Sequence, residues 1–450
     1  MSGEDMRQYL ALTLLASGLG FTAGLTGCDL DTTNPNAPTQ ESAVNSTEGL
    51  INIGVGLQAR FGSSTGALIY AAGLIGDELG PIGTAFSTIS DAEQGIVLPN
   101  AGLASDLWAS NYRTIKSAND IIFNHENVQM PRGLRSGLVG LAYLLKAAAI
   151  GELVQGFEQV AIETYNVSTP EFVERPAALA SVIALLDSAQ IAYSDTAPTA
   201  QFTGSVLVSG FDIRNTIYAY RARYHRLLGN DALALANADS VNRTVFSVIP
   251  FNAQNVNPVF ANSIGAVGVL PRDIFRTSDA SEALRTAFHV KAATITGRDP
   301  LLTPLDSFAR YNVPTAFIPA YYPDEALLIK AEALVNLGRL VEAQAALDSV
   351  RTDCPAAGRV TTDPGPCLPP LAGLQTAQQL LAEIIRNRRY ELFATGLRWE
   401  DLRRLQLVGA TNVAKRCWLP YPIGERNANP ANVPADPEGA VPVANPGPCF

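Results

Sequence analysis

The chain has 450 residues, a hydrophobic content of 47 % and a formal net charge of −10 at pH 7. This acidic balance argues against a nucleic-acid binder, because affinity for nucleic acid comes mainly from Lys and Arg side chains that meet phosphates. The hydrophobic content is ample for a large buried core, and the length allows two or three domains, although no linker obviously divides the body.

The first 27 residues are typical of an export signal. Arg7 precedes an apolar run from Tyr9 to about Leu25, and small residues end that run. The stretch LTGC, which ends at Cys28, predicts a bacterial lipoprotein signal that is cut before this cysteine and lipidated on its thiol. Stable anchoring then needs more than one acyl chain, since each buried CH₂ contributes only about 0.8 kcal/mol. The alternatives are an ordinary signal peptide or a membrane-spanning helix that ends in Cys.

No apolar run after Leu25 approaches the roughly 20 residues that a spanning helix requires. Residues 28–46 are polar and contain prolines, which predicts an extended tether. From about residue 47 the helical period dominates. We therefore expect a body that is held to the membrane by lipid alone.

Helix pairs are predicted at roughly 102–155, 176–240 and 324–351. Each combines apolar helix faces with a connecting turn, and the last has a Gly-containing turn and small Ala residues where the helices cross. Small residues at the crossing let two antiparallel helices approach closely, as in tetratricopeptide repeats. The expected fold class is therefore mostly α, with tetratricopeptide-like helix pairs and few short strands.

Residues of about 250–320 differ from this frame. They mix Pro, Asn, Gly and aromatic residues without a clean period, which predicts a loop-rich insertion, and loops are where binding residues tend to lie. Residues 427–450 contain many prolines and predict an irregular tail. We expect one domain over 47–450, with its helical scaffold at about 47–250 and 320–426.

Four cysteines remain once Cys28 is lipidated, and four cysteines allow three pairings. We expect Cys354–Cys367 to close the Pro- and Gly-rich loop between them, and Cys417–Cys449 to tie the tail to the body. A zinc site is the alternative, but no CxxC motif and no nearby His supports it.

The segment 62–66, GSSTG, fits the G-x-S-x-G nucleophile elbow and would make Ser64 a nucleophile. That motif needs a preceding strand, whereas the flanks here look helical or coil-like. His125, His225 and His289 have neither an i, i+4 partner nor a triad context, so they predict structural histidines. We expect no catalytic residue, no metal and no cofactor.

The run 386–404, RNRRYELFATGLRWEDLRR, alternates arginines with Glu391, Glu400, Asp401 and apolar residues. This pattern predicts an ion-paired helix pair packed on a core rather than a basic patch. The same run resembles the C-terminal signature of the RagB/SusD family, the outer-membrane nutrient-binding lipoproteins of Gram-negative bacteria. Further stretches match in the same order: the lipobox with DLDTTNPN, LWASNYRTIKSANDII, AYLLKAAAIGELVQGFEQVAI, the helix pair around Ala331-Glu332-Ala333, and WLPYPIGERNANP.

The resemblance implies a SusD-like helical body that is not an enzyme. It implies a cell-surface protein that captures an oligosaccharide or another small nutrient and delivers it to a SusC-like TonB-dependent β-barrel transporter. Asp29, directly after Cys28, is an inner-membrane retention signal in some systems. In bacteria rich in this family, however, acidic residues near the lipidated cysteine accompany surface display, so we expect the outer-membrane surface. A helix-repeat scaffold that assembles envelope proteins is the alternative function.

Sugar-binding surfaces need flat aromatic faces with amide, guanidinium and carboxylate groups around them. The three Trp residues lie in segments that match scaffold motifs, so aromatic residues of loops are the candidates. The poverty of loop Trp leaves peptides or other small nutrients open as cargo. A second interpretation of Tyr321 and Tyr322 is that they merely pack at a helix start. The candidate ligand-binding residues are Phe86, Asp91, Arg310, Tyr311, Asn312, Phe317, Tyr321 and Tyr322.

Overall fold

The structure is a computed structural model, and it describes residues 40–450 except 266, 299–303, 355–363, 410–412, 440, 444–448 and 450. The predicted signal peptide, the lipidated Cys28 and most of the predicted tether therefore lie outside the described residues. The chain forms two compact units, residues 1–43 and 44–450. Of the first unit, only the beginning of α2 (Gln40–Val44) is described.

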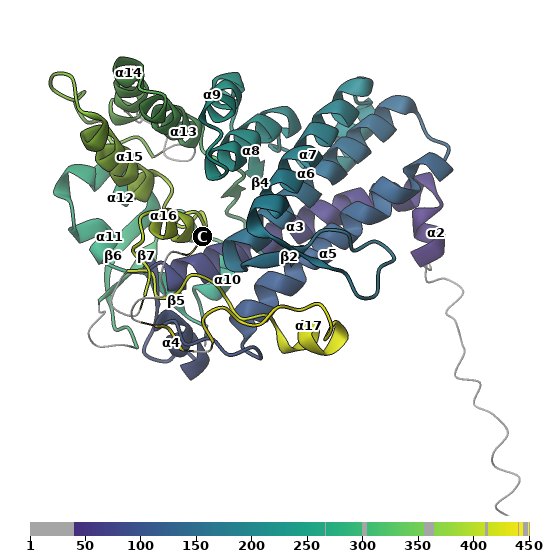
Figure 1. Cartoon of the computed structure of the whole chain (residues 1–450), viewed down its shortest axis with the longest axis horizontal. Helices are drawn as coiled ribbons and strands as arrows, with labels where there is room; N and C mark the ends of the chain where they lie inside the picture. The colour runs from purple at the N-terminus through teal and green to yellow at the C-terminus, as the bar shows by residue number, and fades with distance from the viewer. Residues whose placement is uncertain are drawn as a thin grey trace, which may run out of the picture. The chain divides into compact units, whose positions relative to one another are not determined.

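The second unit is mostly helical, as the sequence predicts (Figure 1). Its longer helices are α3 (Thr47–Ile75), α5 (Gly102–Asn124), α6 (Arg132–Gly156), α7 (Arg175–Asp195), α8 (Ile213–Leu227), α9 (Asp231–Ser240), α13 (Pro323–Asn336), α14 (Leu340–Arg351) and α15 (Ala377–Glu391). Its shorter helices are α4 (Ser87–Glu93), η1 (His125–Asn127), η2 (Phe202–Val206), α10 (Pro258–Asn262), α11 (Ile274–Thr277), η3 (Ala280–Glu282), α12 (Ala283–His289), α16 (Arg398–Arg404) and α17 (Ile423–Ala428).

Side-chain caps fix where several helices begin. Ser46 accepts a hydrogen bond from the amide of Gly49 at 3.1 Å, and Asp212 accepts one from Asn215 at 2.7 Å. Thr376 and Gln379 form a reciprocal capping box at the start of α15. Each cap satisfies a backbone donor that has no partner within its helix, which is why Ser, Thr and Asp are favoured at these positions.

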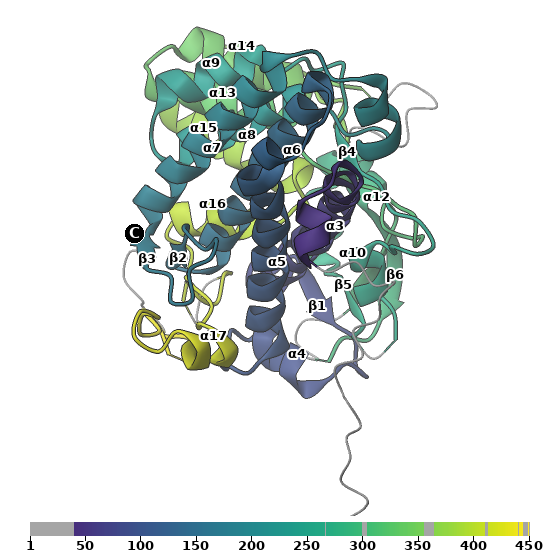
Figure 2. The same cartoon turned by 90° about the vertical axis from the view of Figure 1, so that its right-hand side faces the viewer.

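Helix α6 lies at the centre of the core, against α3, α5 and α7 (Figure 2). Glycines let its neighbours approach closely. A Cβ at Gly140 would lie 2.7 Å from the Cβ of Tyr193, and a Cβ at Gly151 would lie 1.9 Å from the hydroxyl of Tyr224. The absence of side chains at these positions therefore sets how closely α7 and α8 approach α6.

Two helices in the described part of the chain, α6 and α7, could cross a membrane by length and composition. This differs from the expectation that no such run follows Leu25, because single charged and small residues break these helices into shorter apolar runs. In α6, 94 % of the most apolar window is buried inside the protein, as in a core helix. In α7 the corresponding share is 28 %, and this helix packs between α6 and α8.

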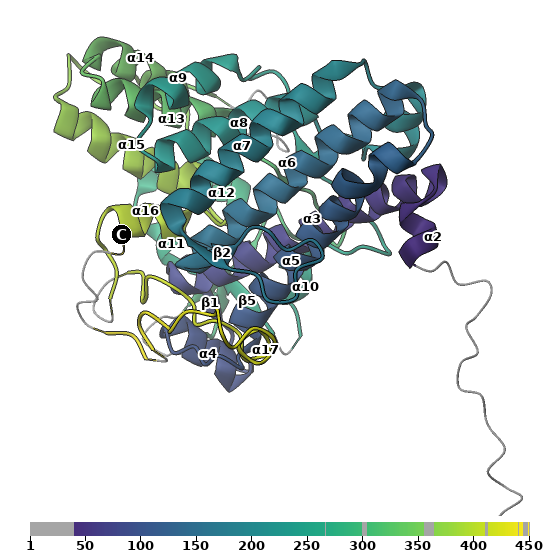
Figure 3. The same cartoon turned by 45° about the vertical axis from the view of Figure 1, so that its right-hand side comes forward.

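The predicted helix pairs at 102–155 and 324–351 correspond to α5–α6 and α13–α14. The predicted pair at 176–240 contains three helices, α7, α8 and α9. Gly229 and Gly338 have φ values of +72° and +74° in the turns after α8 and α13, a conformation that side chains disfavour. Helices α8, α9, α13, α14 and α15 gather at one end of this unit, and α4 and α17 lie at the other (Figure 2, Figure 3).

Four antiparallel two-stranded sheets join segments that are far apart in sequence. The pairs are β1 (Leu79–Pro81) with β5 (Val269–Pro271), β2 (Gln159–Ala161) with β3 (Phe172–Glu174), β4 (Val248–Ile249) with β8 (Ile318–Pro319), and β6 (Val290–Ile295) with β7 (Leu305–Phe308). Strands β4 to β8 lie mostly in the predicted insertion, which also contains α10, α11 and α12. The insertion is thus attached to the scaffold by strand pairing.

The arginine-rich run forms α15 and α16, and its charged groups are buried in ion pairs. Asp401 lies 2.8 Å from Arg388, 2.9 Å from Arg404 and 3.6 Å from Arg226. Burial would raise the pKa of the Asp401 carboxyl, but these three guanidinium groups hold it well below its usual range. The structural interpretation of this run is therefore confirmed.

Both expected disulfides are present, Cys354–Cys367 and Cys417–Cys449, with Cα–Cα distances of 4.3 and 5.6 Å. The zinc interpretation is excluded, since all four cysteines are in disulfides. The second bridge joins residues 32 positions apart and holds the end of the irregular tail against the buried Cys417.

Candidate functional site

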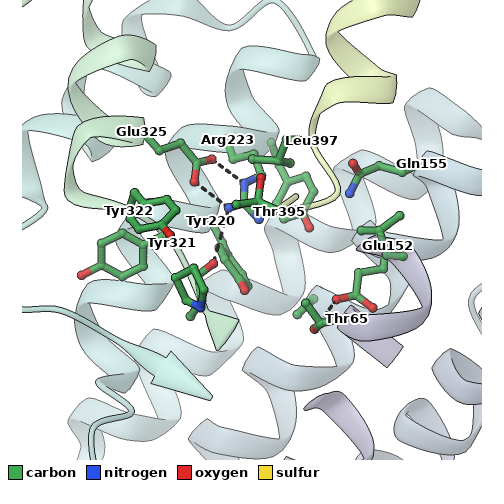
Figure 4. Close-up of a pocket in the computed structure, with 15 residues that line it drawn as sticks. Thr65, Glu152, Gln155, Tyr220, Arg223, Tyr321, Tyr322, Glu325, Thr395 and Leu397 are labelled. Atoms are coloured by element: carbon green, nitrogen blue, oxygen red, sulfur yellow. Dashed lines mark hydrogen bonds and ion pairs between the residues drawn. The ribbon is translucent and has the colours of Figure 1, made fainter. Parts of the chain in front are cut away.

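A buried polar cavity lies between α3, α6 and α8, the segment 319–325 and residues 395 and 397 (Figure 4). Its volume is about 20 Å³. One water molecule needs about 10–15 Å³ measured in this way, so the cavity holds one or two waters and no sugar ring. It is therefore an internal polar site rather than a nutrient-binding pocket.

An ion pair dominates one side of this cavity. The guanidinium of Arg223 donates to both carboxylate oxygens of Glu325, at 2.6 and 2.7 Å, and it lies 4.6 Å from the centroid of the Tyr220 ring. Burial opposes the charge of Arg223, but the Glu325 carboxylate raises the pKa of Arg223 above its ordinary value. Figure 4 shows the two side chains pointing toward each other, with their hydrogen bonds drawn as dashed lines.

Tyr321 and Tyr322 line the same cavity, but they are packed residues. Their exposed fractions are 2 % and 1 %. The hydroxyl of Tyr321 donates to the carbonyl oxygen of Val245 at 3.2 Å, and Tyr322 is the N-cap residue of α13. These contacts favour the alternative interpretation, packing at a helix start, over an open ring face for a ligand.

Arg310 and Tyr311 are also engaged inside the protein. The Arg310 guanidinium donates to the hydroxyls of Tyr311 and Tyr322 and to the carbonyl oxygen of Ala394. It lies 4.1 Å from the Tyr311 ring centroid, and Tyr311 is 1 % exposed. These contacts favour packing of Arg310 and Tyr311 inside the protein over the expected contact with a ligand, because the guanidinium and the hydroxyl groups satisfy one another's hydrogen bonds.

Phe86 is the predicted aromatic that the structure leaves open, with an exposed fraction of 59 %. It precedes α4, directly after the β1 strand and its following turn. The exposed Ser87 follows it in sequence, and Asp91 is exposed on α4, four residues after Ser87 on the same helix face. Ser87, which follows Phe86, and Asp91 thus lie on one exposed face of α4.

Strand pairing brings a second segment to this surface. The amide of Gly83 donates to the carbonyl oxygen of Thr296 at 3.0 Å. The amide of Arg298 donates to the carbonyl oxygen of Pro81 at 2.8 Å. The Arg298 guanidinium donates to the carbonyl oxygen of Ala85, next to Phe86. We call this surface the Phe86 loop face, and it consists of the exposed residues Gly83, Thr84, Phe86, Ser87, Thr88, Asp91, Thr296 and Arg298.

The two remaining candidates lie elsewhere. Asn312 is exposed in the turn after Tyr311, and Phe317 is partly buried with its ring centroid 5.7 Å from that of Phe246. Within the described ranges, no hydrogen bond or ring contact joins either of them to Phe86. Sequence reasoning missed Thr296 and Arg298, because only the long-range bridge between Ile82 and Gly297 and the backbone hydrogen bonds beside it show that their segment meets the Phe86 loop.

Ser64 does not lie on a nucleophile elbow. The whole GSSTG segment is inside α3, where Ser64 is buried and donates to the carbonyl oxygen of Phe61 at 2.9 Å. His289 is buried as well, and burial followed by the Arg310 charge holds its pKa well below the usual range. In the described part of the chain, no three His, Cys, Asp or Glu side chains are placed to hold a metal ion.

Comparison with known proteins gives three findings. Residues 324–419 match the model of the SusD family. No curated protein sequence matches the chain. Several solved structures share its fold at low identity.

A SusD superfamily protein from Bacteroides vulgatus is 15 % identical with a TM-score of 0.66, and the match covers 86 % of this chain and 98 % of that one. A SusD-like carbohydrate binding protein from the same species is 16 % identical with a TM-score of 0.62, covering 82 % and 84 %. Surface glycan-binding protein A from Bacteroides thetaiotaomicron is 12 % identical with a TM-score of 0.64, covering 87 % and 99 %. The chain therefore has the SusD-like fold over most of its length.

Proposed function

We propose that this chain is a SusD/RagB family protein and that it binds a carbohydrate nutrient on the Phe86 loop face. The match of residues 324–419 to the SusD family model and the SusD-like fold support this proposal. Glycan-binding proteins of this family are non-catalytic, so the proposed mechanism is binding alone. The exposed Phe86, beside hydroxyl groups and Arg298, is the observation that carries the proposal.

The chemistry of this surface suits a sugar. A phenyl ring offers a flat apolar face to the C–H side of a pyranose ring, and it keeps this face without ordering many rotatable bonds. Thr84, Ser87 and Thr296 offer hydroxyl groups that both donate and accept. The carboxylate of Asp91 and the guanidinium of Arg298 add one negatively and one positively charged group to these polar side chains. Two of the similar structures are a SusD-like carbohydrate binding protein and a surface glycan-binding protein, which agrees with this cargo.

The proposal extends to the place and partner of the protein. Lipidation at Cys28 would anchor it to the outer membrane at the cell surface, where it would deliver its cargo to a SusC-like TonB-dependent β-barrel transporter. The predicted lipobox and the match of residues 324–419 to the SusD family model support this step.

A pull-down from native outer membranes in mild detergent tests the partner and the anchor together. The expected result is recovery of a large TonB-dependent barrel in about equal amount, with a lipid-modified peptide that begins at Cys28. Recovery of a set of other envelope proteins without a barrel would contradict the import role and support the scaffold alternative. An unmodified amino terminus would contradict the lipid anchor.

A glycan panel tests the cargo. The purified protein is expected to retain at least one oligosaccharide class on the panel. Retention of peptides with no retained glycan would replace carbohydrate by peptide as the proposed cargo.

A further inference from the structure

A groove between α7 and α8 has a volume of about 220 Å³, roughly ten times that of the buried cavity. One turn of each helix lines it. The lining residues are Gln190, Tyr193 and Ser194 from α7, and Arg214, Ile217 and Tyr218 from α8. In both helices the spacing is i, i+3, i+4, which places three side chains on one helix face.

Packing against the core sets this groove. Tyr193 lies where α7 crosses α6, and only a glycine at position 140 leaves room for its backbone there. Ile217 is 2 % exposed and forms the apolar floor between two half-buried tyrosine rings. The groove therefore has fixed walls, with a ring contributed by each helix.

Some polar groups at the rim of the groove form hydrogen bonds with neighbouring side chains, and others face solvent. The Oε1 of Gln190 accepts from the Arg221 guanidinium, which also pairs with Asp187, so the amide is oriented. The Gln190 amide nitrogen lies 3.5 Å from the hydroxyl of Tyr218. Arg214 is exposed, and no hydrogen bond or ion pair links its side chain to another residue of the described ranges.

We propose that this α7–α8 groove is a second carbohydrate subsite, which takes a single acidic sugar unit such as a uronic acid. The Tyr193 and Tyr218 rings would hold the apolar faces of the sugar, Gln190 and Ser194 would bond to its hydroxyl groups, and the Arg214 guanidinium would pair with its carboxylate. A guanidinium recognises a carboxylate through two parallel hydrogen bonds, whereas a neutral sugar offers no such partner. The inference rests on the proposed carbohydrate cargo, but it concerns helices that contribute nothing to the Phe86 loop face.

The test uses the full-length protein in mild detergent, with glucuronic acid and glucose as probes in saturation-transfer difference NMR and calorimetry. Glucuronate is expected to bind about tenfold more tightly than glucose, which corresponds to one charge-assisted contact. The Arg214→Gln variant should lose this preference, and Arg214→Lys should keep part of it. Arg60→Gln, at an exposed arginine of α3 that does not line the groove, is the matched control and should bind like the wild type.

Equal binding of the two probes, or an unchanged preference in Arg214→Gln, would overturn the inference. So would an equal loss in Arg60→Gln. The proposed function fails separately, when no oligosaccharide of the panel is retained. If the protein retains a glycan of the panel but binds glucuronate no more tightly than glucose, the α7–α8 subsite is contradicted and the proposed binding on the Phe86 loop face is not.

Discussion

Thr65 Oγ1 lies 2.7 Å from Glu152 Oε1 and 3.0 Å from the carbonyl oxygen of Phe61. A hydroxyl group has one hydrogen, so Thr65 cannot donate to both oxygens at once. A protonated Glu152 resolves the conflict, since its own O–H donates to Thr65 while Thr65 donates to Phe61. The electrostatics agree, because burial raises the pKa of Glu152 to about 7, although hydrogen bonds from Thr65 and its neighbours oppose the shift.

This protonation makes Glu152→Gln a stabilising change at neutral pH. The folded pKa of about 7 lies above the ordinary value of 4.5, so the folded protein keeps a proton that the unfolded chain releases. The free energy of unfolding therefore falls as the pH rises from about 4.5 to about 7, by an amount on the order of 3 kcal/mol for this group. Glutamine has the shape of the protonated acid and should remove this part of the loss. Urea denaturation between pH 4.5 and 8 measures it.

Glu325→Gln is the matched control, because Glu325 lines the same cavity but is paired with the Arg223 guanidinium through both of its carboxylate oxygens. Removing its charge leaves a buried guanidinium without its partner, which typically costs about 3–5 kcal/mol. Glu78 is a second buried carboxyl whose pKa is raised to about 7, so part of the pH dependence should survive in Glu152→Gln. Destabilisation by Glu152→Gln at pH 7 would show that Glu152 is ionised in the folded protein.

Asp401→Asn should destabilise the protein strongly. The change removes the only carboxylate within 4 Å of Arg388 in the described structure and leaves Arg404 and Arg226 with Glu332 alone. Breaking a buried pair in this way typically costs about 3–5 kcal/mol. Thermal and urea unfolding of the variant would measure the loss.

The control for Asp401 is Asp195→Asn, in which an exposed aspartate loses its pair with the exposed Arg132. Exposed pairs contribute about 0–1 kcal/mol, so this variant should unfold almost as the wild type does. Equal effects of the two substitutions would contradict the structural role assigned to the 386–404 run.

Phe86→Ala should weaken binding of the best oligosaccharide from the panel roughly tenfold, because the ring supplies the stacking face. Stability should change by no more than about 0.5 kcal/mol, since the ring is 59 % exposed. Ile191→Ala removes an apolar side chain that is 73 % exposed on α7, and it should leave affinity unchanged. Calorimetric titration of the wild type and the two variants measures their affinities for the oligosaccharide. Wild-type affinity in Phe86→Ala would contradict binding on the Phe86 loop face.

Breaking the Cys417–Cys449 disulfide with the double Ser variant should lower stability by about 4 kcal/mol in the chain-entropy model, against about 3 kcal/mol for the shorter Cys354–Cys367 loop. Limited proteolysis should then release the tail from the first variant and not from the second. Peptide mapping without reductant checks both bridges. A tail that stays resistant after loss of Cys417–Cys449 would show that its other contacts are sufficient.

Much of the scaffold follows from sequence, because helix formation depends on local spacing. The apolar faces of α13 and α14, the glycine turn between them and the interleaved charges of α15 and α16 are visible within short stretches of chain. Both disulfide pairings were also predictable, since each closes the loop or tail next to it. These are properties that neighbouring residues decide together.

The site depends on contacts between distant segments, which no local pattern reveals. Tyr311, Tyr321 and Tyr322 look like loop aromatics in sequence, but the tertiary structure buries them against Arg310 and Val245. Likewise, Thr296 reaches the Phe86 loop only because Ile82 forms a bridge with Gly297, far later in the chain, and the Gly83 amide donates to the carbonyl oxygen of Thr296.

The sequence by itself therefore determined the helical architecture, the disulfides and the resemblance to a family, all of which rest on local periodicity and on short motifs. Only the tertiary structure decided which aromatic rings remain open to solvent, that Ser64 lies inside a helix, and that α7 and α8 enclose a groove. The exposed fraction of a side chain depends on which distant segments pack against it. Because removing apolar surface from water is favourable, an aromatic ring is buried wherever such a segment can cover it.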